Sequence, residues 1–296
     1  VDVVPGQFNA LGYNVTGFDS LRCAAGGPAM VPLFENDQPG GFQFVHGDVR
    51  ERAALTAAVE QAQPAAVIHL AAVVGFPACR LDPTAATTIN VDGTRNVIDC
   101  APPDARLFFG STGSNYGAVD GVCTEDTPLN PLTLYGQTKT QAEYMMLNTG
   151  RAVAFRFATG YGLSPRMRLD LLPNTLTYLA ATQGYAVIYE RHVRRTFIHV
   201  SDMARAYRHA IEHPSMTGVY NVGDPSMSWT KQDLCVAISE AVPGVQWHYA
   251  EVGQDEDRRD YAVDYSRMTA TGFSCRKDWG FGLRQVADAA HALSWS

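Results

Sequence analysis

The chain has 296 residues, enough for one large domain or two smaller ones around a sizeable core. Hydrophobic residues make up 46% and charged residues 18%, which is ordinary for a soluble globular enzyme. The formal charge of −7, without a run of Lys and Arg, argues against nucleic acid as a partner. No apolar run approaches the ~20 residues that span a bilayer, and no charged-then-apolar leader is visible. The six cysteines show no metal or redox spacing, so we expect a cytoplasmic protein with reduced thiols, no metal and no membrane partner.

Short apolar runs alternate with amphipathic stretches over the first two-thirds of the chain, which predicts repeated strand–helix units. The expected elements, in chain order, are strands 13–19 and 42–49, helix 50–63, strand 65–72, helix 82–100, strand 105–112, a helix carrying Tyr135 and Lys139, and strand 152–159. Residues 65–72 are nearly all apolar, which is typical of a parallel strand buried on both faces. Strands separated by crossover helices imply an α/β fold with a doubly wound parallel sheet.

The pattern loosens beyond Gly162. Loops rich in Pro and Arg alternate there with helices expected over 171–183, 201–212 and 230–242. This change predicts a smaller second lobe at the C-terminal end.

The segment Tyr135-Gly136-Gln137-Thr138-Lys139 is the strongest chemical signal. On a helix, residues four apart face the same way, so the Lys139 ammonium can lie beside the Tyr135 phenol. A free tyrosine titrates near ~10, and a nearby cation lowers that pKa towards the range of a general base. Thr112, at the end of the preceding strand, could hold the oxygen of an alcohol or carbonyl substrate. A Tyr/Lys pair at this spacing is also common as a solvated pair, so its context decides between the two interpretations.

Several short motifs accompany this pair in a fixed order. They are Val15-Thr16-Gly17-Phe18-Asp19, His46-Gly47-Asp48-Val49, His69-Leu70-Ala71-Ala72, Asn90-Val91-Asp92-Gly93-Thr94, Ser111-Thr112-Gly113-Ser114-Asn115-Tyr116-Gly117 and Arg195-Thr196-Phe197-Ile198-His199-Val200-Ser201-Asp202. In this order and at these intervals, from about Leu11 to about Arg267, the chain resembles the extended short-chain dehydrogenase/reductase family. The likeness is strongest to its nucleotide-sugar epimerases and dehydratases.

The resemblance implies a Rossmann-like dinucleotide-binding domain over 1–165 and a smaller C-terminal substrate lobe over 166–296, with 196–213 returning to the first domain. It implies an NAD-dependent epimerase acting at C4 of a nucleoside-diphosphate hexose through a transient keto sugar. In that family Thr112, Tyr135 and Lys139 would be the catalytic residues. A homodimer is also implied, because the helices at 91–100 and 133–147 pair across a two-fold axis in the family. Apolar positions that exceed the needs of one sheet face are Val97, Ile98, Ala142, Met145 and Met146.

The cofactor residues follow from the same comparison. Asp19 ends a predicted strand, where a carboxylate accepts hydrogen bonds from the adenosine ribose and favours NAD over NADP; the alternative is a turn-forming Asp. The resemblance adds Asp48, Val49, Leu70, Ala71 and Ala72, together with Tyr135 and Lys139. His69 is expected to be structural, and Asn90 is expected to support the backbone.

The substrate residues implied by the family are Asn174, Arg195 and Arg259, with Arg258 a rival for the last position. Guanidinium groups suit a diphosphate because they donate paired hydrogen bonds.

Two features depart from the family. No G-x-G-x-x-G opens the chain, and the alignment places Val1 inside the first helix, beyond the expected first strand and glycine-rich loop. The sequence lacks a real N-terminal segment, or the opening segment is altered, or cofactor binding is lost; the retained Tyr/Lys pair argues against the last.

The second departure follows the catalytic threonine. Dehydratases of this family carry an acidic pair there, and this chain has Gly113 and Ser114. That favours epimerisation or simple redox chemistry. A sugar-nucleotide reductase or dehydratase, or a degenerate member that binds ligand without catalysis, stay as alternatives.

Overall fold

The computed structural model describes residues 3–22, 40–119, 121–164, 167–251 and 262–294. Its contacts divide the chain into two compact units. Unit 1 comprises residues 1–117, 128–156 and 204–220, and unit 2 comprises 118–127, 157–203 and 221–296. Each unit is described by itself.

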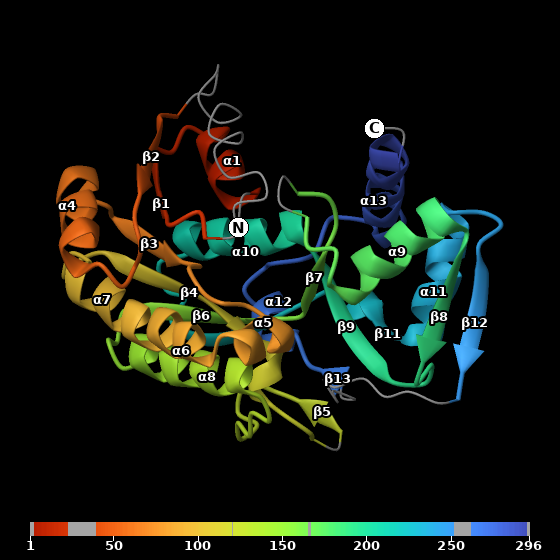
Figure 1. The fold of residues 1–296 in the computed structure, drawn as a ribbon. Coiled ribbons are helices and arrows are strands. Elements are labelled where there is room, and N and C mark those ends of the chain that lie inside the picture. The colour runs from red at the N-terminus through yellow and green to blue at the C-terminus, as the bar shows by residue number, and fades with distance from the viewer. Residues whose placement is uncertain (1–2, 23–39, 120, 165–166, 252–261, 295–296) are drawn as a thin grey trace. The chain divides into compact units, whose positions relative to one another are not determined.

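Unit 1 is built on two sheets (Figure 1). The first pairs β1 (Val15–Asp19) in parallel with β2 (Phe42–His46). The second has the strand order β10-β6-β4-β3, in which β3 and β4 are parallel. Its strands are β3 (Ala66–His69), β4 (Arg106–Thr112), β6 (Ala152–Phe157) and β10 (Gly218–Val222).

The order of these strands matches a dinucleotide-binding sheet. In the order 3-2-1-4-5-6 typical of such folds, β2 and β1 take positions 3 and 2, and β3, β4 and β6 take positions 4, 5 and 6. No described strand takes position 1. The edge position of β3 in its sheet explains why Ala66, Val67 and Ile68 are only half-buried, whereas burial on both faces was predicted.

Helices connect these strands. In chain order they are α1 (Val3–Asn9), α4 (Arg52–Ala62), α5 (Phe76–Leu81), α6 (Pro83–Thr87), a π-helical turn η1 (Thr88–Asp92), α7 (Gly93–Cys100), a 3₁₀ turn η2 (Gly113–Asn115), α8 (Leu134–Leu147) and α10 (Val200–Glu212). The helix α1 lies where the family alignment predicted the first helix. Pro5 falls in its first turn, where a backbone N–H has no helical partner to lose. None of the helices in the described ranges is long and apolar enough to cross a bilayer.

Side chains alternate along the strands of the four-stranded sheet, so both of its faces present side chains to be buried. Helices pack against each face. Phe109 of β4 and Ala154 of β6 belong to one core cluster with Met146 of α8. Phe155 faces the other way and packs edge-on against Tyr207 of α10, with ring centroids 5.1 Å apart. The prediction of an α/β, doubly wound sheet is therefore confirmed.

The predicted helix from Asp82 to Cys100 is present as α6, η1 and α7 in succession. Asp82 caps its start, because the carboxylate accepts a hydrogen bond of 2.9 Å from the backbone N–H of Ala85. The π-turn η1 interrupts the helix at Asn90, whose side chain is buried. Such turns often occur at functional sites.

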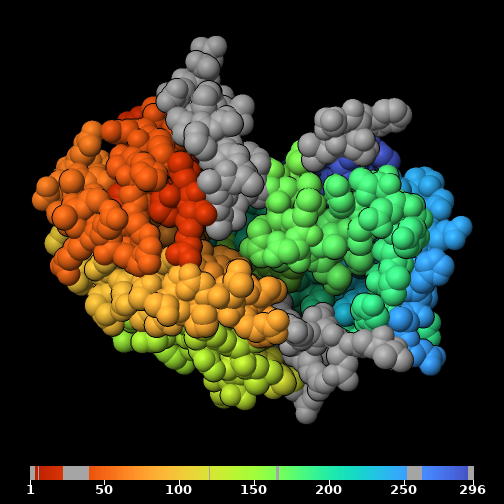
Figure 2. Space-filling view, in the orientation of Figure 1, coloured from red at the N-terminus to blue at the C-terminus, as the bar shows by residue number. Residues whose placement is uncertain are grey.

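Helices α6, α7 and α8 form one layer at the surface of unit 1, coloured gold to lime in Figure 2. The expectation that this layer carries surplus apolar residues is wrong for most of the positions named, because the core itself takes up Val97, Ile98, Ala142 and Met146. Met145 is half-buried. The large apolar side chains exposed on this layer and on the adjoining α5 include Tyr144 and Leu81.

The described residues of unit 2 form three small sheets. One has the order β11-β9-β7, a second pairs β8 with β12, and a third pairs β5 with β13. The strands are β5 (Val122–Cys123), β7 (Thr159–Tyr161), β8 (Tyr185–Tyr189), β9 (Arg194–His199), β11 (Ser228–Thr230), β12 (Gln246–Ala250) and β13 (Ala262–Val263). The helices are α9 (Leu172–Gln183), α11 (Lys231–Ala241), α12 (Ser266–Thr269) and α13 (Trp279–Ser294). A core cluster that includes Leu176, Phe197, Ile238 and Leu283 joins α9, α11 and α13 to β9.

The division of the chain differs from the predicted boundaries in three ways. The first long segment of unit 1 ends at Arg156 instead of 165, and the segment that returns is 204–220 instead of 196–213. Strand pairing explains the second difference, because β9 hydrogen-bonds to β7 and β11 within unit 2. The short segment 118–127 also belongs to unit 2, where β5 pairs with β13.

Candidate functional site

The predicted catalytic residues all lie in unit 1, on β4 and α8. Thr133 caps α8, and its side chain accepts a hydrogen bond of 3.1 Å from the N–H of Gly136. This cap sets Tyr135 in the first turn of the helix and Lys139 one turn later. Tyr135 is half-buried, and Lys139 is buried with only 4% of its surface exposed.

The start of α8 packs against the turn that follows Thr112. A Cβ atom at Gly136 would lie 3.1 Å from the carbonyl oxygen of Ser114 and 2.9 Å from Pro131 Cβ, so a larger residue would force the two segments apart. Thr112 ends β4, and its hydroxyl accepts from the N–H of Ser114 and donates to the Ser114 hydroxyl, both at 3.2 Å. The segments that carry Thr112 and the Tyr/Lys pair are thus brought together.

The surroundings of the Lys139 ammonium change its pKa. Burial lowers the pKa of Lys139 to about 7, against the opposing effects of Glu143 and Cys79. Its Nζ lies 4.0 Å from the centroid of the Phe109 ring, a cation–π contact. Within the described part of the chain it donates no hydrogen bond. An ammonium with unused donors suits a ligand rich in oxygen acceptors, such as the ribose of a dinucleotide.

His69 lies beside this lysine and is structural, as expected. Its Nε2 is 2.9 Å from the Thr94 hydroxyl, which donates to the carbonyl oxygen of Asn90 at 2.6 Å. Burial, together with the charge of Lys139, lowers the pKa of His69 to about 3. The imidazole therefore stays neutral at physiological pH.

Asn90 supports the backbone, as predicted. Its amide oxygen accepts from the N–H of Val73 at 2.7 Å, and its amide nitrogen donates to the Val73 carbonyl at 3.0 Å. The same nitrogen donates to the hydroxyl of Thr138 on α8, also at 3.0 Å. One buried side chain thus ties the segment that follows β3 to the helix of the Tyr/Lys pair. That segment begins with the predicted cofactor residues Leu70, Ala71 and Ala72, all half-buried.

Sequence reasoning missed a buried ion pair next to the catalytic positions. The carboxylate of Glu143, on α8, accepts from Arg156 of β6 with an Nη2–Oε1 distance of 2.6 Å and from the Ser111 hydroxyl at 2.5 Å. Asn115 donates to the same carboxylate at 3.1 Å, and the second guanidinium nitrogen of Arg156 reaches the Tyr116 hydroxyl, also at 3.1 Å.

A signal for this pair was present in the sequence. Arg156 is the charged residue in a strand that is otherwise apolar, and a buried guanidinium requires a carboxylate partner. Glu143 follows Lys139 by four residues, so it lies on the helix face of the Tyr/Lys pair.

The predicted adenosine residues lie at the ends of β1 and β2. Asp19 is exposed, and its Oδ1 accepts a hydrogen bond of 2.7 Å from the N–H of Leu21. Leu21 has a φ of +51°, uncommon for a residue other than glycine, so Asp19 also stabilises a strained turn. The Arg50 side chain donates to both oxygens of Asp48, at 3.0 and 2.6 Å, which lowers the pKa of Asp48. Val49 is part of the core.

The predicted substrate residues of unit 2 are held by the backbone around them. The amide of Asn174, on α9, accepts from the N–H of Gly162 and donates to the carbonyl of Arg168, both at 3.0 Å. Arg195 is buried on β9 and donates to the Arg194 carbonyl at 3.2 Å, while Arg194 donates to the Ser228 carbonyl. The predicted residue Arg259 and its rival Arg258 lie outside the described residues.

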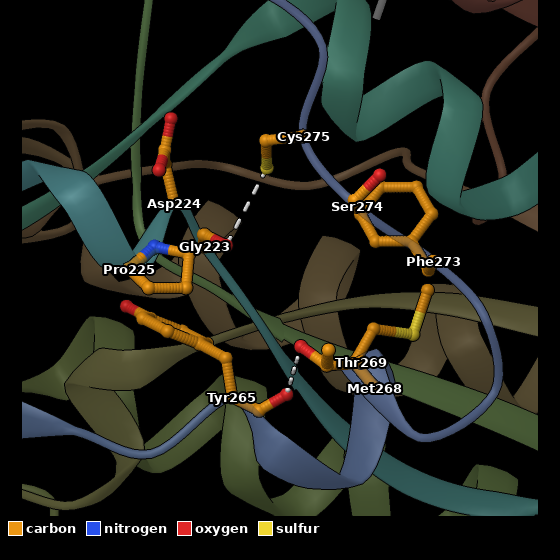
Figure 3. A pocket seen from close by; sticks show the side chains of 9 residues that line it. All are labelled: Gly223, Asp224, Pro225, Tyr265, Met268, Thr269, Phe273, Ser274 and Cys275. Atoms are coloured by element: carbon orange, nitrogen blue, oxygen red, sulfur yellow. Dashed lines mark hydrogen bonds between the residues drawn. The ribbon is translucent and has the colours of Figure 1, made fainter.

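Unit 2 also contains a hollow of about 200 Å³, shown in Figure 3. The Tyr265 ring lies beside Pro225, and the Cys275 thiol donates to the Gly223 carbonyl at 3.5 Å. The residues that line it are Gly223, Asp224, Pro225, Tyr265, Met268, Thr269, Phe273, Ser274 and Cys275. None of the predicted catalytic, cofactor or substrate residues is among them. In the described ranges, no group of three or more His, Cys, Asp or Glu side chains could hold a metal ion.

Comparison with known proteins agrees with this geometry. Residues 4–223 match the NAD dependent epimerase/dehydratase family. The chain belongs to this family. Its members depend on NAD, and the unused donors of Lys139 fit that cofactor.

The relatives include both kinds of enzyme. A UDP-glucose 4-epimerase of Rhizobium leguminosarum bv. trifolii is 29% identical over 243 residues, covering 70% of this chain and 73% of the relative. A dTDP-glucose 4,6-dehydratase of Streptomyces griseus is 28% identical over 295 residues, covering 95% and 87%. Among solved structures, a UDP-glucose-4-epimerase of Stenotrophomonas maltophila with bound NAD and formylated UDP-arabinopyranose has a TM-score of 0.87 at 20% identity, covering 99% and 95%. This structural likeness supports the Rossmann-like fold.

Proposed function

We propose that the protein is an NAD-dependent epimerase that inverts C4 of a nucleoside-diphosphate hexose through a transient keto sugar. The observation that carries this proposal is the turn after Thr112. Its residues Gly113, Ser114 and Asn115 form η2, and Gly113 and the hydroxyl of Ser114 stand where a dehydratase of the family carries two acids. Elimination of water needs a proton donor and acceptor that this turn does not offer.

The proposed mechanism uses three side chains of unit 1. Tyr135, as the phenolate, takes the proton from the C4 hydroxyl, and the Lys139 ammonium stabilises that phenolate. Asp19 and Lys139 would hold NAD, which would supply the acceptor and donor of the C4 hydride. Thr112 holds the oxygen of the keto sugar. After the sugar has turned, the proton returns from Tyr135 to the same oxygen, so protons and hydride balance and no cofactor is consumed.

A reductase acting on a related sugar would use the same three residues. It would consume NADH steadily, so the absorbance of the reduced nicotinamide separates it from an epimerase. A dehydratase would give a product lighter than its substrate by one water, whereas an epimer has the same mass. The remaining alternative, a member that binds ligand without catalysis, predicts NAD binding without any product.

Replacing Tyr135 by Phe tests the assignment of the base. The ring stays and the proton acceptor is lost, so kcat should fall by at least about 100-fold, while binding of NAD and sugar nucleotide survives. Tyr144→Phe, on an exposed position of the same helix, is the control and should leave kcat unchanged. Turnover of the Tyr135 variant near the wild-type rate would show that another group is the base.

Replacing Asp19 tests the cofactor preference. Asp19→Ala should weaken NAD more than NADP, because the carboxylate serves the free ribose hydroxyls. Asp19→Asn is the matched control, since its amide oxygen can still accept from Leu21 N–H but carries no charge. Titration of both nucleotides against the three proteins gives the answer. If the Asn variant binds NAD like the wild type and the Ala variant loses both nucleotides equally, Asp19 serves only the turn.

The substrate diphosphate is assigned to Arg195. A charge-assisted hydrogen bond contributes about 1.5–3 kcal/mol, roughly ten- to hundred-fold in affinity. Arg195→Ala should raise the Kd of a nucleoside diphosphate by that factor and leave NAD binding nearly unchanged. Arg194, its neighbour on β9, points to the other face of the strand, so Arg194→Ala should cost much less. Equal losses in the two variants, or a loss of NAD binding, would contradict the assignment.

Helices α7 and α8 form the proposed homodimer interface. Because most of its apolar side chains are already in the core, the prediction now depends on exposed groups such as Tyr144, which has 53% of its surface exposed. Light scattering at micromolar concentration should give a dimer, and Tyr144→Glu should give a monomer. Val236→Glu, at an exposed apolar position on α11, is the control and should stay dimeric. A monomeric wild type would refute the interface.

A further inference from the structure

The Glu143 carboxylate holds the turn that carries Thr112. It accepts from Ser111, the residue before Thr112, and from Asn115, three residues after it. Asn115 donates to the Ser111 hydroxyl as well, at 2.9 Å, so the two ends of the turn are joined at one point. Arg156 of β6 fixes the carboxylate from the other side. The carboxylate therefore joins the turn that carries Thr112 to α8 and to β6.

The same carboxylate is the anion near Lys139. Tyr135, Lys139 and Glu143 follow one another at intervals of four residues, so they form a row along one face of α8. The titratable groups that face Lys139 from other elements are His69 of β3 and Cys79 of α5. His69 stays neutral, and burial raises the pKa of the Cys79 thiol to about 11. Among these described neighbours, Glu143 is the carboxylate, and it raises the pKa of Lys139 against the effect of burial.

We infer that Glu143 is a positioning residue of the active site, whose carboxylate keeps Lys139 an ammonium and holds the turn that presents Thr112. This inference rests on the proposed function, because it explains how Tyr135, Lys139 and Thr112 are kept competent. A buried ion pair contributes little net stability compared with apolar packing, so stability alone is a weak reason for its presence. Tuning of the neighbouring ammonium is a reason that apolar residues could not supply.

The sign of the effect follows from electrostatics. A carboxylate near Lys139 favours the charged ammonium, so neutralising it lets the proton leave at lower pH. Turnover needs the ammonium, so the rate should fall at high pH as Lys139 loses its proton. In Glu143→Gln this alkaline limb of the pH–rate profile should move to lower pH by about one unit or more. Ser111→Ala removes one hydrogen bond to the carboxylate without removing its charge. In that control the rate should fall while the limb stays in place.

A direct titration provides a readout that needs no substrate. The sequence contains three lysines, Lys139, Lys231 and Lys277, so the ε-methylene signals of ¹³C-labelled lysine can be assigned with a Lys139→Met variant. The Lys139 signal should titrate at lower pH in Glu143→Gln than in the wild type. It should titrate at the wild-type pH in Ser111→Ala. An unchanged Lys139 titration in Glu143→Gln would overturn the inference and leave Glu143 only as the ion-pair partner of Arg156.

A second variant keeps the test possible if Glu143→Gln does not fold. Glu143→Gln leaves the Arg156 guanidinium buried without its carboxylate, which is strongly destabilising. Glu143→Gln combined with Arg156→Met removes both charges, and a downward shift of the Lys139 titration should persist but be smaller, because loss of the guanidinium favours the ammonium. Failure of the proposed function can be told apart from failure of this inference. If Tyr135→Phe stays active, Tyr135 is not the base and the proposed function is wrong. The lysine titration would still decide the role of Glu143.

Discussion

The protonated state of one buried lysine is the constraint on which the site depends. An ammonium that is almost fully removed from water loses its proton more readily, and burial brings the pKa of Lys139 down to about 7. At that value a small change in local charge decides whether Tyr135 has a cation beside it. The packing of β4 and α5 against α8 contributes to the burial, and Glu143 supplies the opposing charge. The fold and the chemistry are thus coupled at a single ammonium.

The π-turn η1 and the Glu143–Arg156 ion pair both connect neighbouring elements to helix α8. Asn90 ties the segment after β3 to α8 through Thr138, and Arg156 ties β6 to α8 through Glu143. Each of these side chains is buried, and each bridges two or more elements. Helix α8 is therefore fixed by polar contacts at specific points as well as by apolar packing. Such contacts define a geometry, which general apolar packing does not do as sharply.

Much of the fold followed from apolar periodicity, because strands and helices differ in how often a side chain meets the core. The strand ending at Thr112 and the helix over 172–183 agree with prediction within one or two residues. The domain division was harder to predict, since it depends on β9 pairing with β7 and β11, which lie far away in sequence. The surplus apolar positions were misjudged for a similar reason, because a pattern does not reveal how many faces of α7 and α8 the core covers.

The candidate site, like the fold, has one part that could be predicted from the sequence and one part that could not. The spacing of Tyr135 and Lys139 is local and could be predicted from the sequence. The partners of Glu143 come from β4, η2 and β6, and only a folded chain brings them together. The lone charge in strand 152–157 was a usable sign that such a partner exists, but not of which residue it is.

In the proposed reaction, hydride leaves and returns at one carbon of a sugar held by Tyr135 and Thr112, while the Lys139 ammonium stabilises the Tyr135 phenolate. A nucleoside-diphosphate hexose carrying deuterium at C4 tests it most directly, with NAD present and products separated by chromatography and mass spectrometry. The account predicts two epimers of equal mass that both keep deuterium at C4. A product lighter by one water, or with deuterium moved to another carbon or lost to solvent, would contradict it.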